Sequence, residues 1–528
     1  MSAAVAEVLP LAVVPGINSL AAGLVTGQPD VTAFLPDPPT LESVTRRASE
    51  VLARFRPRDP AHADPELRAF TDGRVAGVVA GQQAGLFTGP LLTLVKAIAA
   101  RKLAEAAAAV GAPAQALFWC ASEDHDLAEV TRVPVPEAER MRELGPPAEP
   151  LAANRRPIGA LPIELDVRAV LEQAAALIGQ PPDPEAYQTL ERLTAGRTYA
   201  QAFVDTLRWL LGEPQPVADA ARAADKPDLL PLAERLLTER QTVKRLLDER
   251  AARLVAAGHP LQVTGDPQAL PLFALVEGER YALHAAGERI ALKGKPDAQP
   301  LEVAEVLDRF RSGAWLPSFS ALTRPLAASV LYPVAASVLG PAEIAYWAQA
   351  HPLFAWAGVV PPVVVPRPMV ALIEPSSRRL LDKLGLTLPE LLEGADAVLL
   401  RRGAQRAGGV LAELADVKAE ALARLDALGP RLQEVDGALA KALETTRGNI
   451  RFALEKLEER VAAAAGRSEE VLARQVQRLA VALAPDRRLA ERAYTPLHYL
   501  LRYGRAGLAG PILAGLRWDT PGVQLLEL

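Results

Sequence analysis

The chain has 528 residues, a formal charge of −5 at pH 7 and a single cysteine, Cys120. Because this length exceeds what one hydrophobic core normally supports, we expect several domains. The slight negative charge predicts no general attraction to nucleic acid or anionic membranes, and one cysteine excludes both an internal disulfide and a multi-cysteine metal site. Small molecules or protein partners are therefore the expected ligands, and a reducing cytoplasm is the expected location.

No segment of the sequence is typical of a signal peptide or a membrane span. The N-terminus lacks a basic leader before its apolar run. The longest apolar stretch, residues 325–347, contains three prolines and Glu343, which favours a buried strand and its neighbours over a transmembrane helix. We therefore expect no membrane association.

Four segments are predicted in chain order. Residues 1–133 contain a strand, a long helix and a second strand, which is typical of a βαβ unit with a parallel sheet. Residues 134–228 read as a mostly helical insertion. Residues 229–375 begin with a helix, continue as a small antiparallel meander over 272–292, and return to the core, which 361–374 should close. Residues 376–528 form a helical domain and a tail.

The helical domain has apolar residues spaced three and four apart, a heptad pattern that predicts a coiled coil. Gly429 and Pro430 should end one long helix and begin the next, and a second turn is expected near 462–470. An antiparallel helical hairpin is the simplest arrangement. Its apolar seam favours a homodimer, although packing on the protein's own core is an alternative.

The loop at residues 81–90, "GQQAGLFTGP", follows the first core strand and precedes the long helix. Its glycines let a ligand approach the backbone, and Gly89 with Pro90 predicts an N-cap and a first helical residue whose free amides suit an anion. A purely structural turn is the alternative, since neither GxGxxG nor a P-loop is present. The candidate binding residues are Gly81, Gln82, Gln83, Gly85, Thr88 and Gly89.

A second loop, "SEDHD" at 122–126, follows the second strand, so it should lie beside the first loop. We expect its acidic neighbours to raise the pKa of His125, which then handles a proton, while Glu123 and Asp124 orient a positively charged group. Asp126 is a candidate binding residue and equally a candidate helix N-cap. Cys120, just before the loop, is expected to be a small buried side chain rather than a nucleophile.

A third group of candidates lies in the second part of the core. Glu343 and Tyr346 fall near the start of a helix that follows a strand. Arg324 and Arg367 stand beside apolar strands, where they could bind carboxylates or form structural ion pairs. The histidines show no metal-ligand spacing, so we assign no metal site.

The motifs "AGQQAGLFTGPLLTLVKAI", "FWCASEDHDLAEV", residues 324–349 and residues 361–367 together resemble the cysteine-adding enzymes of bacillithiol biosynthesis. The motifs occur in that family's order, and the resemblance spans most of the chain. It implies an α/β fold, with a Rossmann-like parallel-sheet core, connecting insertions and an α-helical coiled-coil C-terminal domain that forms a homodimer.

The same resemblance implies a ligase that joins the carboxyl of cysteine to the amine of glucosaminyl malate, the last step in making this low-molecular-weight thiol. Chemistry and fold lead us to expect ATP as the activator, although no classical ATP motif is present. Two alternatives are a nucleotidyltransferase-like enzyme of other specificity and a non-enzymatic coiled-coil protein that senses a ligand.

Overall fold

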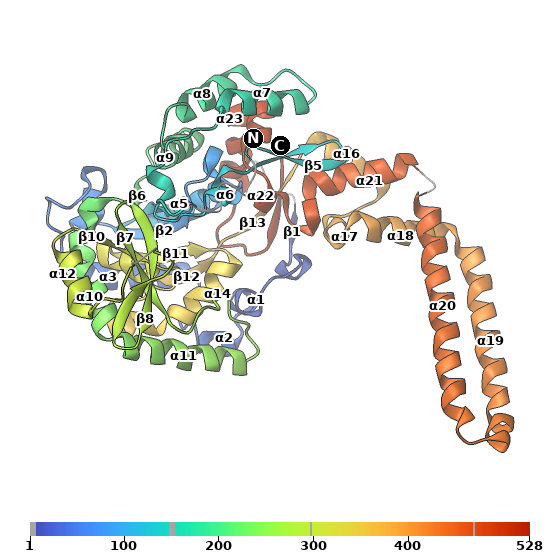
Figure 1. The fold of residues 1–528 in the computed structure, drawn as a ribbon. Coiled ribbons are helices and arrows are strands. Elements are labelled where there is room, and N and C mark those ends of the chain that lie inside the picture. The colour runs from blue at the N-terminus through green and yellow to red at the C-terminus, as the bar shows by residue number, and fades with distance from the viewer. Residues whose placement is uncertain (1–6, 147–153, 296–297, 468–469) are drawn as a thin grey trace. The chain divides into compact units, whose positions relative to one another are not determined.

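The computed structural model describes residues 7–146, 154–295, 298–467 and 470–528. Its chain separates into two compact units (Figure 1). Unit 1 comprises Met1–Val135, Arg142–Ile373 and Glu491–Leu528, and unit 2 comprises Pro136–Met141 and Glu374–Ala490. The C-terminal tail, which we expected together with the helical domain, therefore belongs to the α/β unit.

A five-stranded parallel sheet forms the centre of unit 1, in the order β12-β11-β2-β3-β6. The predicted βαβ unit is confirmed, because β2 and β3 pair in parallel and α5 connects them. The chain adds strands to one side of β2 and then, from β11, to the other, so the carboxyl ends of β2 and β11 form a topological switch point, where such sheets bind ligands. The elements are β2 Ala76–Gln82, α5 Leu92–Ala109, β3 Ala114–Cys120, β6 Val217–Asp219, β11 Val334–Leu339 and β12 Val363–Pro366.

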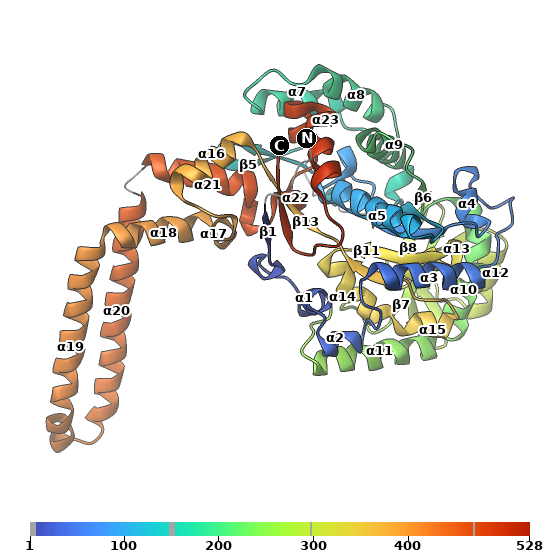
Figure 2. The same cartoon turned by 180° about the vertical axis from the view of Figure 1, so that it is seen from behind.

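Both faces of this sheet are buried, which explains why its strands read as nearly continuous apolar runs. Alternate residues enter two cores: Val78 and Phe118 pack with α3 and α5, whereas Val79 and Leu117 pack with α10 and α14. Figure 2 shows α3 and α5 side by side, in dark and light blue. The helices are α3 Leu41–Arg54, α10 Lys226–Thr238 and α14 Pro341–Ala350.

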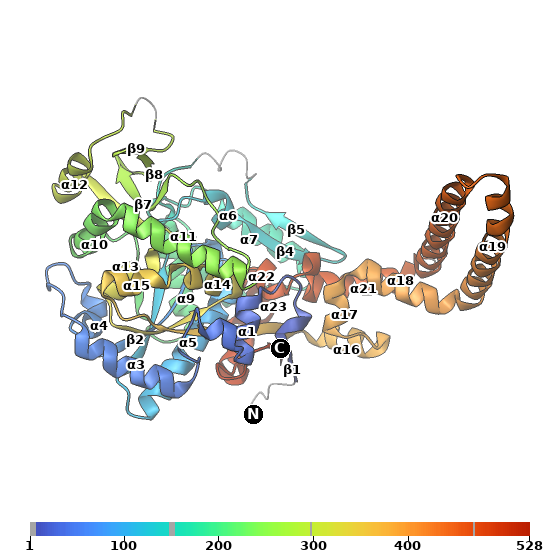
Figure 3. The same cartoon turned by 90° about the horizontal axis from the view of Figure 1, so that it is seen from below.

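The predicted antiparallel meander is confirmed as β7 Ala269–Val276, β8 Glu279–Ala286 and β9 Arg289–Leu292 (Figure 3). A fourth strand, β10 Trp315–Phe319, pairs with β7. This sheet shares a hydrophobic core with one face of the central sheet. The same core contains buried residues of four further helices: α11 Arg240–Ala256, α12 Val303–Arg311, α13 Arg324–Leu331 and α15 Pro352–Ala357.

The predicted helical insertion contains α7 Val167–Leu177, α8 Pro184–Thr194 and α9 Tyr199–Leu211, preceded by a hairpin of β4 Val133–Glu137 and β5 Arg140–Leu144. Its predicted end at residue 228 is wrong, because β6 pairs with β3 and so belongs to the core sheet. A three-residue strand is too short to show a periodic pattern.

The segment 361–374 does not close the core sheet as one piece. β12 pairs with β11, but β13 Met369–Ile373 joins a second sheet, ordered β1-β14-β13, with β1 Glu7–Leu9 and β14 Val523–Glu527. Pro368, which has no amide hydrogen for a strand ladder, lies at the break. Before β14 the chain forms α23, Leu497–Gly515.

Unit 2 contains an antiparallel helical hairpin, formed by α19 Gly408–Val435 and α20 Leu439–Arg467. A hairpin was predicted, but its reversal was expected near 462–470, where α20 instead continues to Arg467. The predicted break at Gly429 and Pro430 is wrong, because α19 continues through both residues. The turn comes at Asp436, whose carboxylate accepts from Ala438 N at 2.8 Å and favours a turn over a further helical residue. Part of the second predicted turn, residues 468–469, lies outside the described residues. The remaining helices are α16 Pro375–Leu384, α17 Leu388–Glu393, α18 Ala395–Arg406 and α21 Glu470–Leu483.

Candidate active site

The two predicted loops meet at the carboxyl edge of the central sheet. Gln82 and Cys120 are register partners at the ends of β2 and β3. One residue further on, Gln83 Nε2 donates to Asp124 Oδ2 at 2.8 Å. The sequence-based expectation that the loops are neighbours is therefore confirmed.

Asp124 is the carboxylate on which the polar groups of this edge converge. Its Oδ1 accepts from His125 N at 3.0 Å, and Arg280 and Arg324 approach it to 3.7 and 3.8 Å. Burial raises the pKa of Asp124, but Arg324, the Gln83 hydrogen bond and Arg280 together outweigh burial, so the pKa lies below its ordinary value. Asp124 is thus a partly exposed anion at neutral pH.

His125 does not have the raised pKa that its acidic neighbours led us to expect. Burial lowers the pKa of His125, and Arg280 and Arg155 lower it further, against the opposing effect of Asp124 and Asp126. The expectation is wrong because the ring is partly buried and because Arg280, which comes from β8 far away in the sequence, places Nη1 3.3 Å from His125 Nδ1. His125 is therefore a neutral imidazole at pH 7, with 37% of its side chain exposed.

Glu123 points away from solvent and is already paired. Its carboxylate contacts Lys226 Nζ and accepts from Ser318 Oγ at 2.9 Å. Both Glu123 and Lys226 are buried. The structure thus gives Glu123 a protein cation, where the sequence had suggested a substrate ammonium group.

The other residues near this loop have structural contacts. Asp126 caps the short helix α6, Leu127–Thr131, by accepting from Glu129 N at 3.1 Å. Cys120 is fully buried, and burial raises its pKa well above the ordinary thiol value, so the expectation of a buried side chain is confirmed. Across the loop, Gly159 lies so close to Ser122 that an added Cβ would come within 2.4 Å of the serine Cβ.

The glycine-rich loop is less open than predicted. Gly81, Gln82 and Gln83 are half-buried, but residues 84–89, including Gly85, Thr88 and Gly89, are buried. The N-cap is Leu91 instead of Gly89, and its amide donates to Tyr494 O at 2.8 Å. Gly85 and Gly89 pack backbone to backbone, since a Cβ on Gly85 would lie 2.7 Å from the Gly89 Cα. The predicted anion site at this helix end is therefore covered by protein.

The third group of candidates is split between the site and the interior. Glu343 accepts from Gly340 N at 2.7 Å and pairs with the buried Lys96 Nζ of α5 at 2.6 Å. Lys96 also donates to Gly81 O at 3.0 Å and so links the start of α14 to the end of β2. Burial and then Glu343 raise the pKa of Tyr346 far above its ordinary value, while Arg324 opposes them. Arg324, whose guanidinium is 3.8 Å from Asp124, adjoins the Asp124 cluster.

Arg367 lies in the interior, where it forms a structural ion pair. Its Nη1 is 2.7 Å from Glu491 Oε1, and the two side chains are 1% and 0% exposed. Of the two roles considered from the sequence, carboxylate binding and a structural ion pair, Arg367 therefore has the second.

Sequence reasoning missed four polar residues that support the site: Lys96, Lys226, Arg280 and Ser318. Each comes from a helix or strand outside the two predicted loops. A lone lysine within the apolar run of α5 was the one visible signal, since a buried lysine needs an anionic partner.

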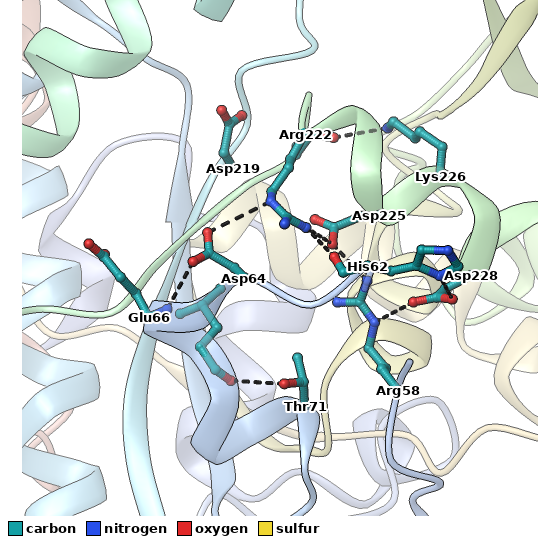
Figure 4. A network of polar contacts seen from close by, with 12 residues as sticks. Arg58, His62, Asp64, Glu66, Thr71, Asp219, Arg222, Asp225, Lys226 and Asp228 are labelled. Carbon is teal, nitrogen blue, oxygen red and sulfur yellow. Dashed lines mark hydrogen bonds and ion pairs between the residues drawn. The ribbon is translucent and has the colours of Figure 1, made fainter. Parts of the chain in front are cut away.

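Lys226 is flanked by a partly buried network of polar side chains (Figure 4). Arg58 donates to Asp225 at 2.7 Å and to Asp228 at 2.6 Å, the residues on either side of Lys226 and Pro227. His62 Nδ1 lies 2.9 Å from the other oxygen of Asp228. These contacts hold residues 225–228 in place and so position Lys226 beside Glu123.

Within the described residues, no group of three or more His, Cys, Asp or Glu side chains is placed to hold a metal ion. None of the described helices is both long and apolar enough to cross a membrane.

The family model described as "Bacillithiol biosynthesis BshC, N-terminal Rossmann-like domain" matches residues 45–368. This chain belongs to the bacillithiol biosynthesis BshC family. The C-terminal coiled-coil domain of the same family matches residues 370–510. The resemblance stated from the sequence motifs is therefore confirmed, together with the Rossmann-like and coiled-coil parts of the fold.

Curated relatives agree with this assignment and carry the name "Putative cysteine ligase BshC". The protein from Koribacter versatilis is 29% identical over 94% of this chain and 95% of its own length. The protein from Solibacter usitatus is 29% identical over 88% of this chain and 86% of its own length. The protein from Thermus thermophilus is 30% identical over 83% of this chain and 86% of its own length. The BshC family is a ligase family, as the sequence predicted.

Proposed function

We propose that this BshC-family protein joins the carboxyl group of cysteine to the amine of glucosaminyl malate, the last step of bacillithiol biosynthesis. Family membership supports the proposal. The structural observation that carries it is the 2.8 Å contact between Gln83 and Asp124, which joins the two loops at the switch point of the sheet. His125 and Arg324 lie at the same edge.

The charges at this edge suit the two proposed substrates. Asp124, whose low pKa keeps it ionised, can bind the ammonium form of an amine. Arg324 is 27% exposed and only 3.8 Å from Asp124, so its guanidinium can bind a malate carboxylate beside that amine. His125 is the side chain that we propose contacts the reacting groups.

ATP remains our proposal for the activator of the cysteine carboxyl. Residues 84–89, which we expected to bind its phosphates, are buried, and Leu91 N is bonded to Tyr494 O. Those residues do not fit a phosphate group, so we derive no step through ATP. The proposed chemistry fits the predicted cytoplasmic location, which stays a prediction.

The ligase proposal predicts that Asp124→Asn and His125→Gln each lower cellular bacillithiol about 100- to 1,000-fold, the range expected when one group that stabilises charge in the reacting complex is removed. Mass spectrometry of low-molecular-weight thiols, in cells lacking the native chain and expressing each variant, measures the product and the accumulated amino-sugar precursor. Asp308→Asn is the matched control, because this carboxylate is 74% exposed and lies on α12.

Unchanged product in both variants would refute the ligase assignment for this site. Tight nucleotide binding that no amino-sugar substrate affects would instead support the nucleotidyltransferase-like alternative. Loss of product in the Asp308→Asn control would show a general effect of charge on the protein.

We also propose that the coiled coil forms a homodimer. One face of α19 carries four apolar side chains between 42% and 77% exposed, spaced seven, eleven and seven residues apart, so they form one stripe along the helix. They are Val410, Val417, Leu428 and Val435. An exposed apolar stripe of this length needs a partner, and the same stripe on a second copy supplies a self-complementary one.

Homodimer formation predicts a molar mass twice the 56.2 kDa of one chain in multi-angle light scattering. The double variant Val417→Lys/Leu428→Lys is expected to be monomeric, because it places charge in the apolar stripe. Ala412→Lys/Ala423→Lys adds the same charge with the same spacing on another face of α19 and should remain dimeric. A monomeric native protein, or a dimer that survives the stripe variant, would contradict the proposal.

A further inference from the structure

We propose that Arg280 is a positioning residue that fixes His125 as a neutral imidazole with its proton on Nε2. His125 then serves as a hydrogen-bond donor to the reacting carbonyl oxygen, and not as the proton acceptor that the sequence suggested. This inference rests on the proposed ligase function for the chemical role, whereas the tautomer of His125 can be tested independently.

The contact between the two side chains decides the tautomer. Arg280 Nη1 lies 3.3 Å from His125 Nδ1. A guanidinium group offers only N–H donors and has no acceptor. Burial lowers the pKa of Arg280 to about 10, so the group is still charged at pH 7. His125 Nδ1 must therefore accept, and the proton of the neutral ring lies on Nε2.

Arg280 cannot easily turn away from His125. Its side chain is 4% exposed, and its Nε donates to Ser318 Oγ at 2.9 Å. Its Nη2 donates to Phe319 O at 3.1 Å, and its guanidinium carbon lies 3.8 Å from the centre of the Phe273 ring. Because each nitrogen of the guanidinium has a partner, Nη1 is directed at the imidazole by the β8 and β10 strands.

The hydrogen bonds behind Arg280 have a fixed direction. Ser318 Oγ accepts from Arg280 and donates to Glu123 Oε2 at 2.9 Å. The other oxygen of Glu123 contacts Lys226 Nζ, which also donates to Ala220 O at 2.9 Å. Reversal at any point would place two donors or two acceptors face to face, so this buried series holds Arg280 as a donor toward His125.

The charged groups around His125 act on the ring in opposite directions, and Asp124 Oδ1 lies 3.8 Å from the same Nδ1 that faces Arg280. Asp124 and Asp126, on its own loop, favour the protonated ring, while Arg280 on β8 and Arg155, on the segment that crosses the loop, disfavour it. Burial adds to the effect of the arginines. With Nδ1 occupied and 37% of the side chain exposed, Nε2–H is the group that His125 can offer to a substrate. Such a donor stabilises the negative charge that develops on a carbonyl oxygen during acyl transfer.

The test is ¹⁵N NMR of the imidazole nitrogens in the full-length protein labelled at its six histidines. Signals of His125 are assigned by their loss in His125→Gln. We expect a proton-bearing Nε2 and an unprotonated Nδ1 at pH 7 and above. Arg280→Met, which removes the donor and the charge, should give a mixture of tautomers and a His125 titration at higher pH. Arg280→Lys keeps a cationic donor and should restore the native pattern.

The same variants are then compared for cellular bacillithiol. Arg280→Met should lower the product about 100-fold, the size of effect that a misplaced reacting group produces, and Arg280→Lys should lower it less. A proton on Nδ1 of the native protein, or unchanged His125 signals in Arg280→Met, would overturn the inference. The native measurement alone decides the tautomer, even if Arg280→Met fails to fold.

The two proposals fail in different ways. The expected tautomer in a protein that makes no bacillithiol would refute the ligase function and leave the tautomer assignment standing. Normal product from a protein whose His125 carries its proton on Nδ1 would refute only the role of Arg280.

Discussion

Replacing Arg367 by methionine is expected to lower the free energy of unfolding of unit 1 by about 3 to 5 kcal/mol. The substitution leaves Glu491, whose side chain is 0% exposed, as a buried carboxylate without its cation. Glu491 Oε2 also accepts from Val370 N at 3.0 Å, at the start of β13, so the disturbance reaches the sheet that joins both ends of unit 1. Urea denaturation followed by tryptophan fluorescence measures the change.

A double variant separates the loss of the cation from the loss of packing. Arg367→Met/Glu491→Gln removes the unpaired charge and keeps an acceptor for Val370 N, so it should recover most of the lost stability. Arg324→Met is the contrasting case. Because this guanidinium is partly exposed, its loss should change the free energy of unfolding by less than about 1 kcal/mol, but it should lower the amount of bacillithiol. A stable Arg367→Met protein that makes no bacillithiol would return Arg367 to the substrate-binding role considered from the sequence.

Lys226→Met is expected to destabilise unit 1 by about 3 to 5 kcal/mol as well, because it leaves Glu123 buried and unpaired. It should also lower cellular bacillithiol, since Glu123 holds Ser318 and, through it, Arg280. Thermal and urea unfolding measure the first effect and thiol mass spectrometry the second.

The matched variant is Lys226→Met/Glu123→Gln, which removes both charges and keeps an acceptor for Ser318. We expect it to regain most of the stability and much of the product. If stability returns and the product does not, the negative charge of Glu123 itself takes part in binding, as first inferred from its position in the acidic loop. Unchanged stability in Lys226→Met would contradict the assignment of a buried ion pair.

Local patterns were enough to predict the centre of the fold. The apolar strands on either side of α5 require a parallel pair, and parallel strands end at one edge, so the proximity of the two loops was predictable, although the contact between Gln83 and Asp124 was not. Patterns of three residues were too short, which is why β6 was assigned to the insertion. At Pro430 the rule that proline ends a helix was overridden, because the loss of one hydrogen bond did not stop α19.

The chemistry of the site was harder to predict, because its polar partners come from remote parts of the chain. The acidic neighbours of His125 suggested a raised pKa, but burial of the ring and then Arg280, which is 155 positions away, lower the pKa instead. Glu123 looked available to a substrate until the structure placed Lys226 against it. Local sequence therefore identified the loop at 122–126 as the candidate site, whereas the charge state of its residues depends on tertiary contacts.

The position of β14 between β1 and β13 has a consequence for how this protein is made. The sheet needs residues 523–527, which the ribosome adds after all of Glu374–Ala490. Unit 2 can therefore acquire its helices while β1 and β13 still expose unpaired backbone edges to the cell interior. Nascent chains that stall before β14 should be the form most prone to capture by chaperones.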